Sequence, residues 1–101
     1  MKLSSKQIRY LRGLGHHLSP VAMIGQAGVT KTVIASIQDV LTVHELIKIK
    51  ALSSTSKTRH EIADQLKKTT GGTVVQILGK TLLLYKENKD RRLDKKIILP
   101  D

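Results

Sequence analysis

The chain has no cysteine, phenylalanine or tryptophan, and Tyr10 and Tyr85 are the only aromatic residues among its 101. The absence of cysteine excludes disulfides, cysteine zinc sites and thiol nucleophiles, and it agrees with a cytoplasmic location. With so few aromatic side chains, Ile, Leu and Val must build the hydrophobic core. The same scarcity excludes the aromatic platform on which RRM-type domains stack bases.

Long apolar runs are also absent, and none approaches the roughly 18 residues that a membrane-spanning helix requires. The first residues, Met1–Lys6, carry charge with no apolar stretch after them, which is unlike a signal peptide. No segment combines a basic face with large apolar anchors, as a membrane-surface helix does. We therefore expect a cytoplasmic protein without a membrane partner.

Acidic residues are few, because 18 Lys and Arg face only 8 Asp and Glu, which gives a formal net charge of +10. Such a charge repels itself within one small domain and costs stability unless a polyanionic partner is present. A chain of this length forms one domain rather than two. Nucleic acid is therefore the leading candidate partner.

Helix signals occur in three segments. A capping box at Ser4–Gln7 predicts a first helix over Ser5–Leu14. An N-cap at Thr30, followed by apolar residues at the helical period, predicts a second helix. A second capping box, Thr58–Glu61, predicts a third helix that ends at the glycine pair beginning with Gly71.

Two strands are expected between these helices. Val21–Ile24 is a continuous apolar run too short for a helix, which predicts a strand buried on both faces. Leu46–Leu52 alternates between apolar and polar residues, and this period places Lys48 and Lys50 on one side of a second strand. One face of that strand is therefore basic.

A hairpin ends the predicted fold. Val74–Leu78 and Thr81–Tyr85 flank the dipeptide Gly79–Lys80, a connection typical of a type II′ turn. The resulting order αβαβαββ predicts one α/β domain with a four-stranded mixed sheet packed with three helices. We expect this domain to cover residues 1–97. Residues 86–101 are mostly charged and are expected to form a loose C-terminal segment, although Ile97–Leu99 are apolar enough to dock on the core.

The junction between the first strand and the second helix combines glycines with a lysine, in the residues Gly25, Gln26, Ala27, Gly28 and Lys31. Glycines let the backbone approach a ligand, and a helix N-terminus offers unpaired N–H groups and partial positive charge. The pattern favours a phosphate, although such glycines often serve only the turn. The spacings of a P-loop and of a dinucleotide-binding fold are absent, so we expect neither ATP nor NAD nor another cofactor.

The chain resembles the bacterial YhbY family in collinear segments: Leu3–Gln7, Leu11–Leu14, Pro20, Gly25–Gly28, His44–Lys50 and Gly79–Tyr85. That family is the stand-alone bacterial form of the CRM domain, which is named for chloroplast RNA splicing and ribosome maturation. The resemblance implies a fold similar to the C-terminal domain of translation initiation factor three. It also implies RNA binding, association with precursors of the large ribosomal subunit, and a G-x-x-G loop that acts like the backbone clamp of KH domains.

Two further basic sets are candidate RNA contacts, namely Lys6, Arg9 and Arg12 on the first helix and Lys48 and Lys50 on the second strand. The first set is expected to extend a basic face beside the glycine loop, and its alternative is an ordinary solvated helix face. The alternative for the second set is a pair of lysines that protects an exposed strand edge.

Catalytic and metal sites are not indicated by the remaining polar residues. The four histidines lack the spacing and the acidic or cysteine neighbours of a closed metal site. The pair His44 and Glu45 lies between a helix and a strand, where such residues usually make caps and turns. We expect no enzyme, no metal and no small-molecule substrate.

Two other functions stay open. The basic surface of a protein-docking adaptor would meet an acidic protein of the ribosome, and its RNA binding would be incidental. A general nucleic-acid binder would also take DNA, because phosphates are common to both polymers and no helix-turn-helix is present. Binding to naked RNA separates the first alternative from direct RNA recognition.

Overall fold

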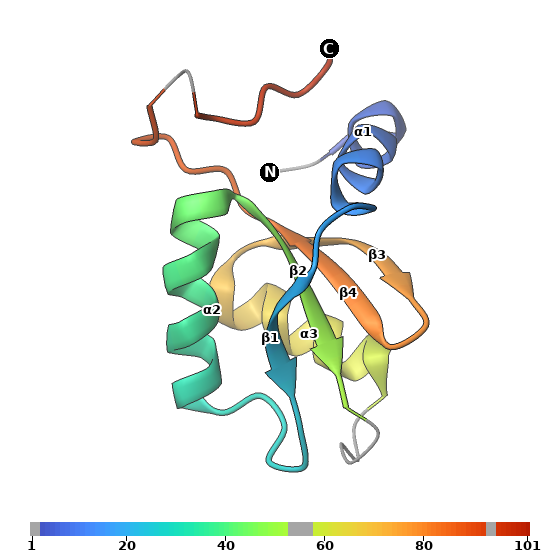
Figure 1. Cartoon of the computed structure of the whole chain (residues 1–101), viewed down its shortest axis with the longest axis vertical. Coiled ribbons are helices and arrows are strands. Elements are labelled where there is room, and N and C mark those ends of the chain that lie inside the picture. Colours follow the sequence, from blue (N-terminus) through green and yellow to red (C-terminus); the bar gives the residue numbers. More distant parts are fainter. Residues whose placement is uncertain (1–2, 53–57, 93–94) are drawn as a thin grey trace.

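The computed structural model describes residues 3–52, 58–92 and 95–101 of the chain. Four strands form one sheet in the order β1-β2-β4-β3, in which β1 and β2 are parallel and the other pairs are antiparallel (Figure 1). The elements are α1 (Ser5–Gly15), β1 (Pro20–Ile24), α2 (Lys31–His44), β2 (Leu46–Ala51), α3 (Arg59–Thr70), β3 (Thr73–Leu78) and β4 (Thr81–Tyr85). The predicted order and the mixed sheet are confirmed.

Side-chain caps start the helices where the sequence predicts. The Ser4 hydroxyl oxygen accepts from the Gln7 N–H at 3.1 Å, and the Gln7 side-chain oxygen accepts from the Ser4 N–H at 3.0 Å. The capping box of Thr58 and Glu61 closes in the same way, at 3.1 and 3.2 Å. Because these bonds satisfy N–H groups that a helix start leaves unpaired, the boundaries follow from local sequence.

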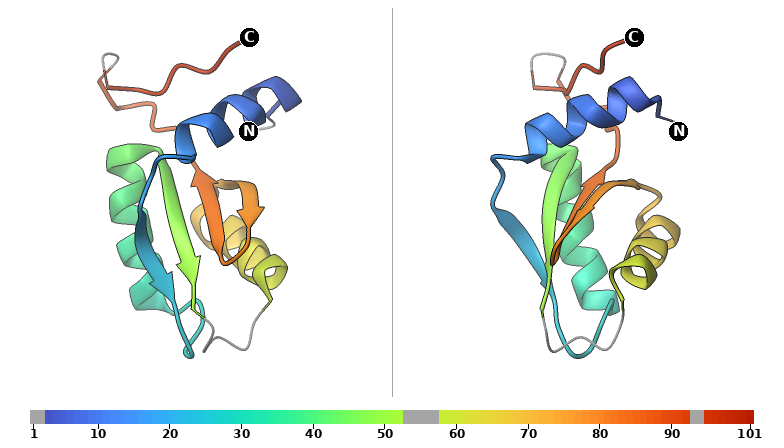
Figure 2. Two further views of the ribbon diagram at one scale, coloured as in Figure 1. Left: turned by 45° about the vertical axis from the view of Figure 1, so that its right-hand side comes forward. Right: turned by 90° about the vertical axis from the view of Figure 1, so that its right-hand side faces the viewer.

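The two faces of the sheet are covered to different extents (Figure 2). On one face, α2 and α3 bury the larger core cluster, whose buried members are Ile24, Ile37, Leu41, Ile47, Ile49, Ala51, Ile62, Leu66, Leu82 and Leu84. On the other face, α1 lies across one end only and buries a smaller cluster of Leu11, Leu46, Val75, Leu83 and Tyr85. Both clusters are almost entirely aliphatic, as the composition requires.

Strand β1 forms an edge of the sheet, and the prediction that it is buried on both faces is wrong. Ile24 is fully buried, but Val21 and Met23 are 50% and 59% exposed. The reason is that α1 covers only the far end of their face, and an apolar run alone does not show whether a strand is central. We call Val21 and Met23, together with the adjacent Lys48 and Lys50 of β2, the open sheet face.

The hairpin between β3 and β4 has the predicted turn. Gly79 adopts a φ of 58°, whereas Lys80 does not have a positive φ, which is the sign pattern of a type II′ turn. Leu78 pairs directly with Thr81 across the turn, so the connection is two residues long.

The C-terminal segment, which the sequence predicts to be loose, makes specific contacts with the domain. Ile97 and Leu99 pack against the smaller core cluster. The Gln7 side-chain amide donates to the Pro100 carbonyl oxygen at 3.0 Å, which joins this segment to α1. Residues 93 and 94 of the segment lie outside the described residues. The docking of Ile97–Leu99 that the sequence allows is therefore partly realised.

Stability measurements should distinguish two glycines of α1. A Cβ on Gly15 would lie 2.5 Å from Cδ1 of the buried Leu83, so Gly15→Ala should lower the free energy of unfolding by about 1–3 kcal/mol. A Cβ on Gly13 meets no atom within 4 Å, so Gly13→Ala should raise it by about 0.5–1 kcal/mol, because alanine favours helix. Urea denaturation measures both, and a neutral Gly15→Ala would contradict the packing of α1 on β4.

Candidate nucleic-acid interface

The loop between β1 and α2 is a tight turn at one end of the molecule (Figure 1). The Gly28 N–H donates to the Gly25 carbonyl oxygen at 3.0 Å, and Gln26 and Ala27 are exposed at the tip. Gly28 has a φ of 73°, which residues with a Cβ rarely adopt. The turn therefore needs glycine at position 28 for its own conformation, whether or not a ligand binds.

Helix α2 begins directly after this turn. Thr30 Oγ1 accepts from the Val33 N–H at 3.2 Å, and Lys31 is the first helical residue, as the sequence predicts. The N–H groups of the first helical turn and the positive end of the helix dipole therefore lie beside the loop. Lys31 is exposed there. The arrangement suits an anion at the exposed tip of the turn.

The lysines of β2 point away from α2 and α3, as the alternation predicts. Lys50 is exposed and pairs with Met23 of β1, close to the end of the sheet that carries the loop. Lys48, two residues earlier, is half-buried on the same face. The hairpin turn reaches this end too, because the Lys80 carbonyl oxygen accepts from the Ala51 N–H at 2.7 Å.

The basic residues of α1 do not lie beside the loop, contrary to the expected single basic face. α1 occupies the opposite end of the molecule, whose longest dimension is 38 Å (Figures 1 and 2). Lys6 and Arg9 are exposed there. Arg12 has a structural role, since its Nε donates to the Val75 carbonyl oxygen at 2.8 Å within the irregular part of edge strand β3. The structure thus divides the predicted residues into two separate groups.

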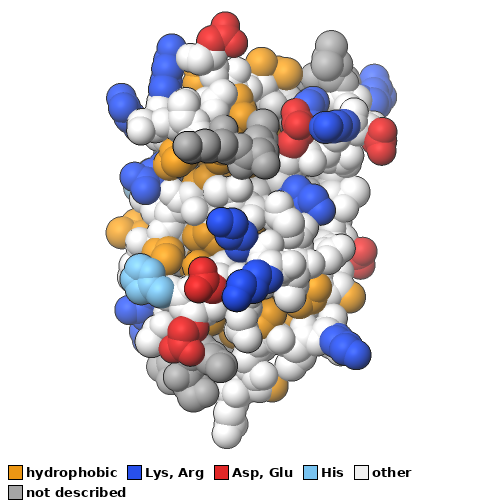
Figure 3. All heavy atoms as spheres, turned by 180° about the vertical axis from the view of Figure 1, so that it is seen from behind, with side chains coloured by type: hydrophobic (Ala, Val, Ile, Leu, Met, Phe, Trp, Pro, Cys, Tyr) orange, Lys and Arg blue, Asp and Glu red, His pale blue; other side chains and the backbone are white. Residues whose placement is uncertain are grey.

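Acidic side chains are distributed unevenly over the surface. None of the residues in α1 or in the four strands is acidic. The acidic residues of the described chain are Asp39, Glu45, Glu61, Asp64, Glu87, Asp90 and Asp101, and they lie in α2, after α2, in α3 and beyond β4. Figure 3 shows the side of α2 and α3, where basic, acidic and apolar side chains are interspersed. The open sheet face and α1 contribute positive charge only.

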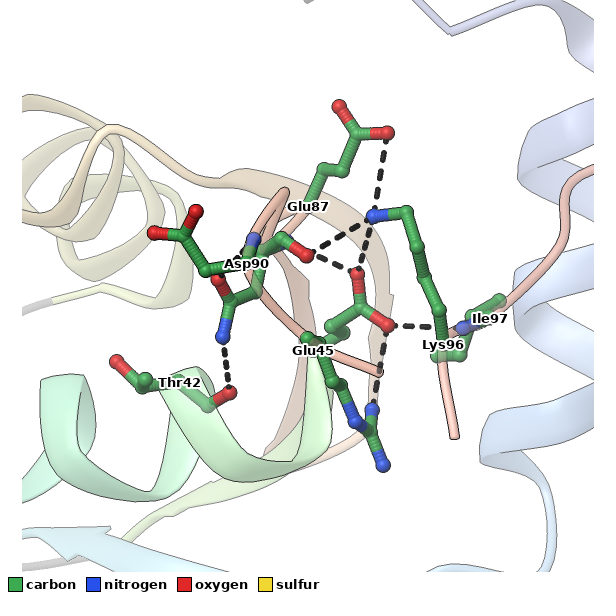
Figure 4. A network of polar contacts seen from close by, with 8 residues as sticks. Thr42, Glu45, Glu87, Asp90, Lys96 and Ile97 are labelled. Carbon is green, nitrogen blue, oxygen red and sulfur yellow. Dashed lines mark hydrogen bonds and ion pairs between the residues drawn. The ribbon is translucent and has the colours of Figure 1, made fainter. Parts of the chain in front are cut away.

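Glu45, which the sequence assigns to a cap or turn, organises the C-terminal segment (Figure 4). Its carboxylate is fully buried, and Oε1 accepts from Arg91 Nη1 at 3.2 Å and from the Ile97 N–H at 2.8 Å. Oε2 accepts from Lys96 Nζ at 3.1 Å and from the Asn88 N–H at 2.9 Å. Four donors from one segment therefore converge on a single carboxylate. The excess of basic residues after β4 is the sequence feature that indicates an acidic partner for this segment.

The backbone of Glu45 is held as firmly as its side chain. Its φ of 62° is the only positive value among non-glycine residues of the described chain. Its N–H donates to the Leu41 carbonyl oxygen, and its carbonyl oxygen accepts from the Lys86 N–H, both at 2.8 Å. Strained conformations of this kind persist where the surroundings determine them from several sides.

The network sets the charge state of Glu45. Burial raises the pKa of this carboxyl, but the N–H groups of Asn88 and Ile97 and the Lys96 ammonium outweigh burial and hold the pKa below its ordinary value of 4.5. Burial, together with the charge on Glu45, also raises the pKa of Tyr85 to about 12. At neutral pH the carboxylate is therefore ionised and the phenol neutral.

The described residues provide neither a metal cluster nor a membrane-spanning helix. Within residues 3–52, 58–92 and 95–101, no three His, Cys, Asp or Glu side chains come together as a metal site. Among these same residues no helix has the length and apolarity to span a membrane. His16 and His17 make a T-shaped ring contact at 5.2 Å at the C-terminal end of α1.

Comparisons with known proteins agree on one family. The model of the CRS1/YhbY (CRM) domain matches residues 3–86. An RNA-binding protein of Haemophilus influenzae is 38% identical over 91 residues, covering 90% of this chain and 92% of that protein. YqeI of Bacillus subtilis, named a probable RNA-binding protein, is 38% identical over 98 residues, covering 97% and 99%. The solution structure of SAV1595 of Staphylococcus aureus matches with a TM-score of 0.81 and 35% identity, covering 98% and 100%.

Substitution of Glu45 tests the network. In Glu45→Gln, an amide NH₂ faces groups that are all donors, so we expect the free energy of unfolding to fall by about 3 kcal/mol. Glu87→Gln is the control, because Glu87 also pairs with Lys96, at 3.3 Å, but is partly exposed; its effect should stay below about 1 kcal/mol. Chemical denaturation measures both, and equal losses would contradict the role of the buried carboxylate.

The lowered pKa of Glu45 also predicts a pH dependence. A carboxyl whose pKa is lower in the folded state adds stability above its unfolded pKa, and loses that contribution as pH falls through the folded value. The native chain should therefore lose stability below about pH 4.5. Glu45→Gln should show a shallower loss in denaturation measured across this range, whereas parallel curves would argue against the assigned pKa.

Proposed function

Because this chain belongs to the CRS1/YhbY (CRM) domain family, we propose that it binds RNA through the loop Gly25–Gly28, the start of α2 and the open sheet face. The observation that carries this proposal is the uneven charge. Helix α1 and the four strands contain basic residues and no acidic ones, whereas α2 and α3 contain both. The acidic residues of α2 and α3 repel a polyanion, and the sheet and α1 contain none that does.

The proposed contact grips the RNA backbone. A phosphate lies at the exposed tip formed by Gln26 and Ala27, where the N–H groups of the first turn of α2 and the Lys31 ammonium stabilise its charge. Lys48 and Lys50 hold neighbouring phosphates along the open sheet face. Contacts of this kind position RNA without reading its sequence, so specificity comes mainly from RNA shape.

The proposed RNA is large-subunit ribosomal RNA within precursors of the ribosome, where the chain would serve assembly as a non-catalytic binder in the cytoplasm. This part of the proposal is supported by the family resemblance and by relatives that are named for RNA binding rather than for a reaction. Sedimentation of cell extracts tests it: the protein should travel with precursors of the large subunit, and a profile confined to free protein would contradict the ribosomal role.

One observation favours the protein-docking alternative. A groove of about 450 Å³ extends from the open sheet face toward α1: Val21 and Lys48 line it together with the apolar residues Leu14, Leu18 and Ile97. Leu14, Leu18 and Val21 are exposed, and such patches often mark protein contacts. A chain that binds an acidic ribosomal protein but no naked RNA would favour this alternative. Equal affinity for DNA and RNA would favour a general nucleic-acid binder.

Salt dependence and a charge reversal at the loop test the proposed contact. The native chain should bind a large-subunit ribosomal RNA fragment with an affinity that falls steeply with salt, by a log–log slope of roughly −0.7 to −0.9 per neutralised phosphate. The double change Gln26→Asp and Ala27→Asp keeps both glycines and places two negative charges at the tip. We expect it to weaken binding by more than about tenfold.

The matched control lowers the net charge by the same two units away from the loop. Lys67→Gln and Lys68→Gln remove two positive charges from the exposed surface of α3. This control should bind within about twofold of the native chain at moderate salt. Equal losses for the two double variants would show that only net charge matters and would overturn the assignment to the loop.

A further inference from the structure

Helix α1 carries a contiguous surface that neither the fold nor the proposed loop contact explains. Arg9 and Tyr10 each lie three or four residues from both Lys6 and Gly13, so the four residues share one side of the helix. This side is opposite the one that packs on the sheet through Leu11. We call these four residues the outer face of α1.

The side chains of this face are exposed and without partners in the described residues. Within residues 3–52, 58–92 and 95–101, no hydrogen bond or ion pair is recorded for Lys6, Arg9 or Tyr10. Tyr10 is 42% exposed, whereas Tyr85, the other aromatic residue, is buried. Two cationic side chains and one aromatic ring are thus exposed, with no partner among the described residues, on a helix that contains no acidic residue.

Gly13 is a further distinctive residue of this face. It lies in the interior of α1 with ordinary helical geometry, because the positive-φ glycines are elsewhere. Nothing lies within 4 Å of the position where its Cβ would be, so the domain itself does not require glycine there. Glycine weakens an exposed helix relative to alanine. A glycine that the fold does not need, beside cations on an open surface, leaves room for the backbone of another molecule to approach the helix closely.

We infer that the outer face of α1 binds a single-stranded segment of RNA, with phosphates on Lys6 and Arg9, a base stacked on Tyr10 and the sugar–phosphate backbone against Gly13. The inference rests on the proposed RNA binding and adds a second contact of different chemistry. Stacking on a tyrosine requires an unpaired base, which single strands offer and duplexes do not. The loop and open sheet face, in contrast, offer backbone contacts only.

The position of α1 determines which kind of RNA can occupy both contacts. The loop Gly25–Gly28 lies at the opposite end of a molecule whose longest dimension is 38 Å. A folded RNA with a helical part and an unpaired part can therefore occupy both contacts. One short strand does not have to span the molecule. Junctions between paired and unpaired RNA are the substrate class that this arrangement fits.

The test uses substitutions at Gly13, because they separate binding from folding. Gly13→Ala should raise the melting temperature by a few degrees and yet weaken binding to an unstructured RNA of about 12 nucleotides by at least threefold. Gly13→Gln, a larger and neutral helix former, should weaken binding by about tenfold. A change that stabilises the protein cannot lose affinity through misfolding.

Tyr10 and a distant lysine provide the controls, all measured by fluorescence anisotropy on the full chain. Tyr10→Ala should weaken binding about fivefold or more, and Tyr10→Phe should bind within twofold of the native chain, because the ring keeps its stacking. Lys68→Gln removes one charge from the exposed surface of α3 and should have little effect. A perfect duplex of similar length should be insensitive to the changes at Gly13 and Tyr10.

The outcomes separate this inference from the proposed function. If the loop variant with Asp at positions 26 and 27 loses binding while the variants of Gly13 and Tyr10 bind single strands like the native chain, the inference is overturned and the proposed function stands. If duplex and single strand lose affinity equally, the single-strand assignment is overturned. If the native chain binds no RNA, the proposed function and the inference both fail.

Discussion

A four-stranded sheet has two apolar faces to bury, and this chain has three helices with which to bury them. Two of them, α2 and α3, are needed for the face that carries Ile47 and Ile49. The remaining helix covers only one end of the other face, through Leu11. The uncovered end must therefore tolerate water, which explains why β2 places Lys48 and Lys50 there and why Val21 and Met23 are left exposed. The candidate interface is the part of the sheet that the helices do not cover.

At the end of this face that α1 covers, the C-terminal segment adds to the cover, because Ile97 and Leu99 pack on the smaller cluster. The buried carboxylate of Glu45 makes this packing possible. A segment with six Lys and Arg between residues 86 and 96 has little reason to pack on a basic domain. Glu45 supplies the opposing charge from inside the domain, at the junction of α2 and β2, and brings Ile97 onto the smaller cluster. The same carboxylate pairs with Arg91 and Lys96, which offsets part of the positive charge of the segment.

The sequence predicts what depends on neighbouring residues and misses what depends on distant ones. The capping boxes at Ser4 and Thr58 and the alternation around Lys48 are local, so the helices, the strand and its basic side were all predictable. Three other features depend on how the elements are arranged in space: the edge position of β1, the distance between α1 and the loop, and the hydrogen bond from Arg12 to Val75. Glu45 was identified only as a cap or turn residue, since its partners are 43 to 52 positions away in the chain. From the sequence, it was therefore easier to choose candidate residues by their chemistry than to predict which of them lie together in the folded chain.

We propose that RNA meets the loop Gly25–Gly28, the open sheet face and α1, none of which contains an acidic residue. Amide chemical-shift mapping of the isotope-labelled chain, titrated with a large-subunit ribosomal RNA fragment, tests it most directly. We expect shifts at Gln26, Ala27 and Lys50 and along the exposed residues of α1, with little change in α3. Shifts concentrated on α3, or confined to the groove of Leu14 and Leu18, would contradict it.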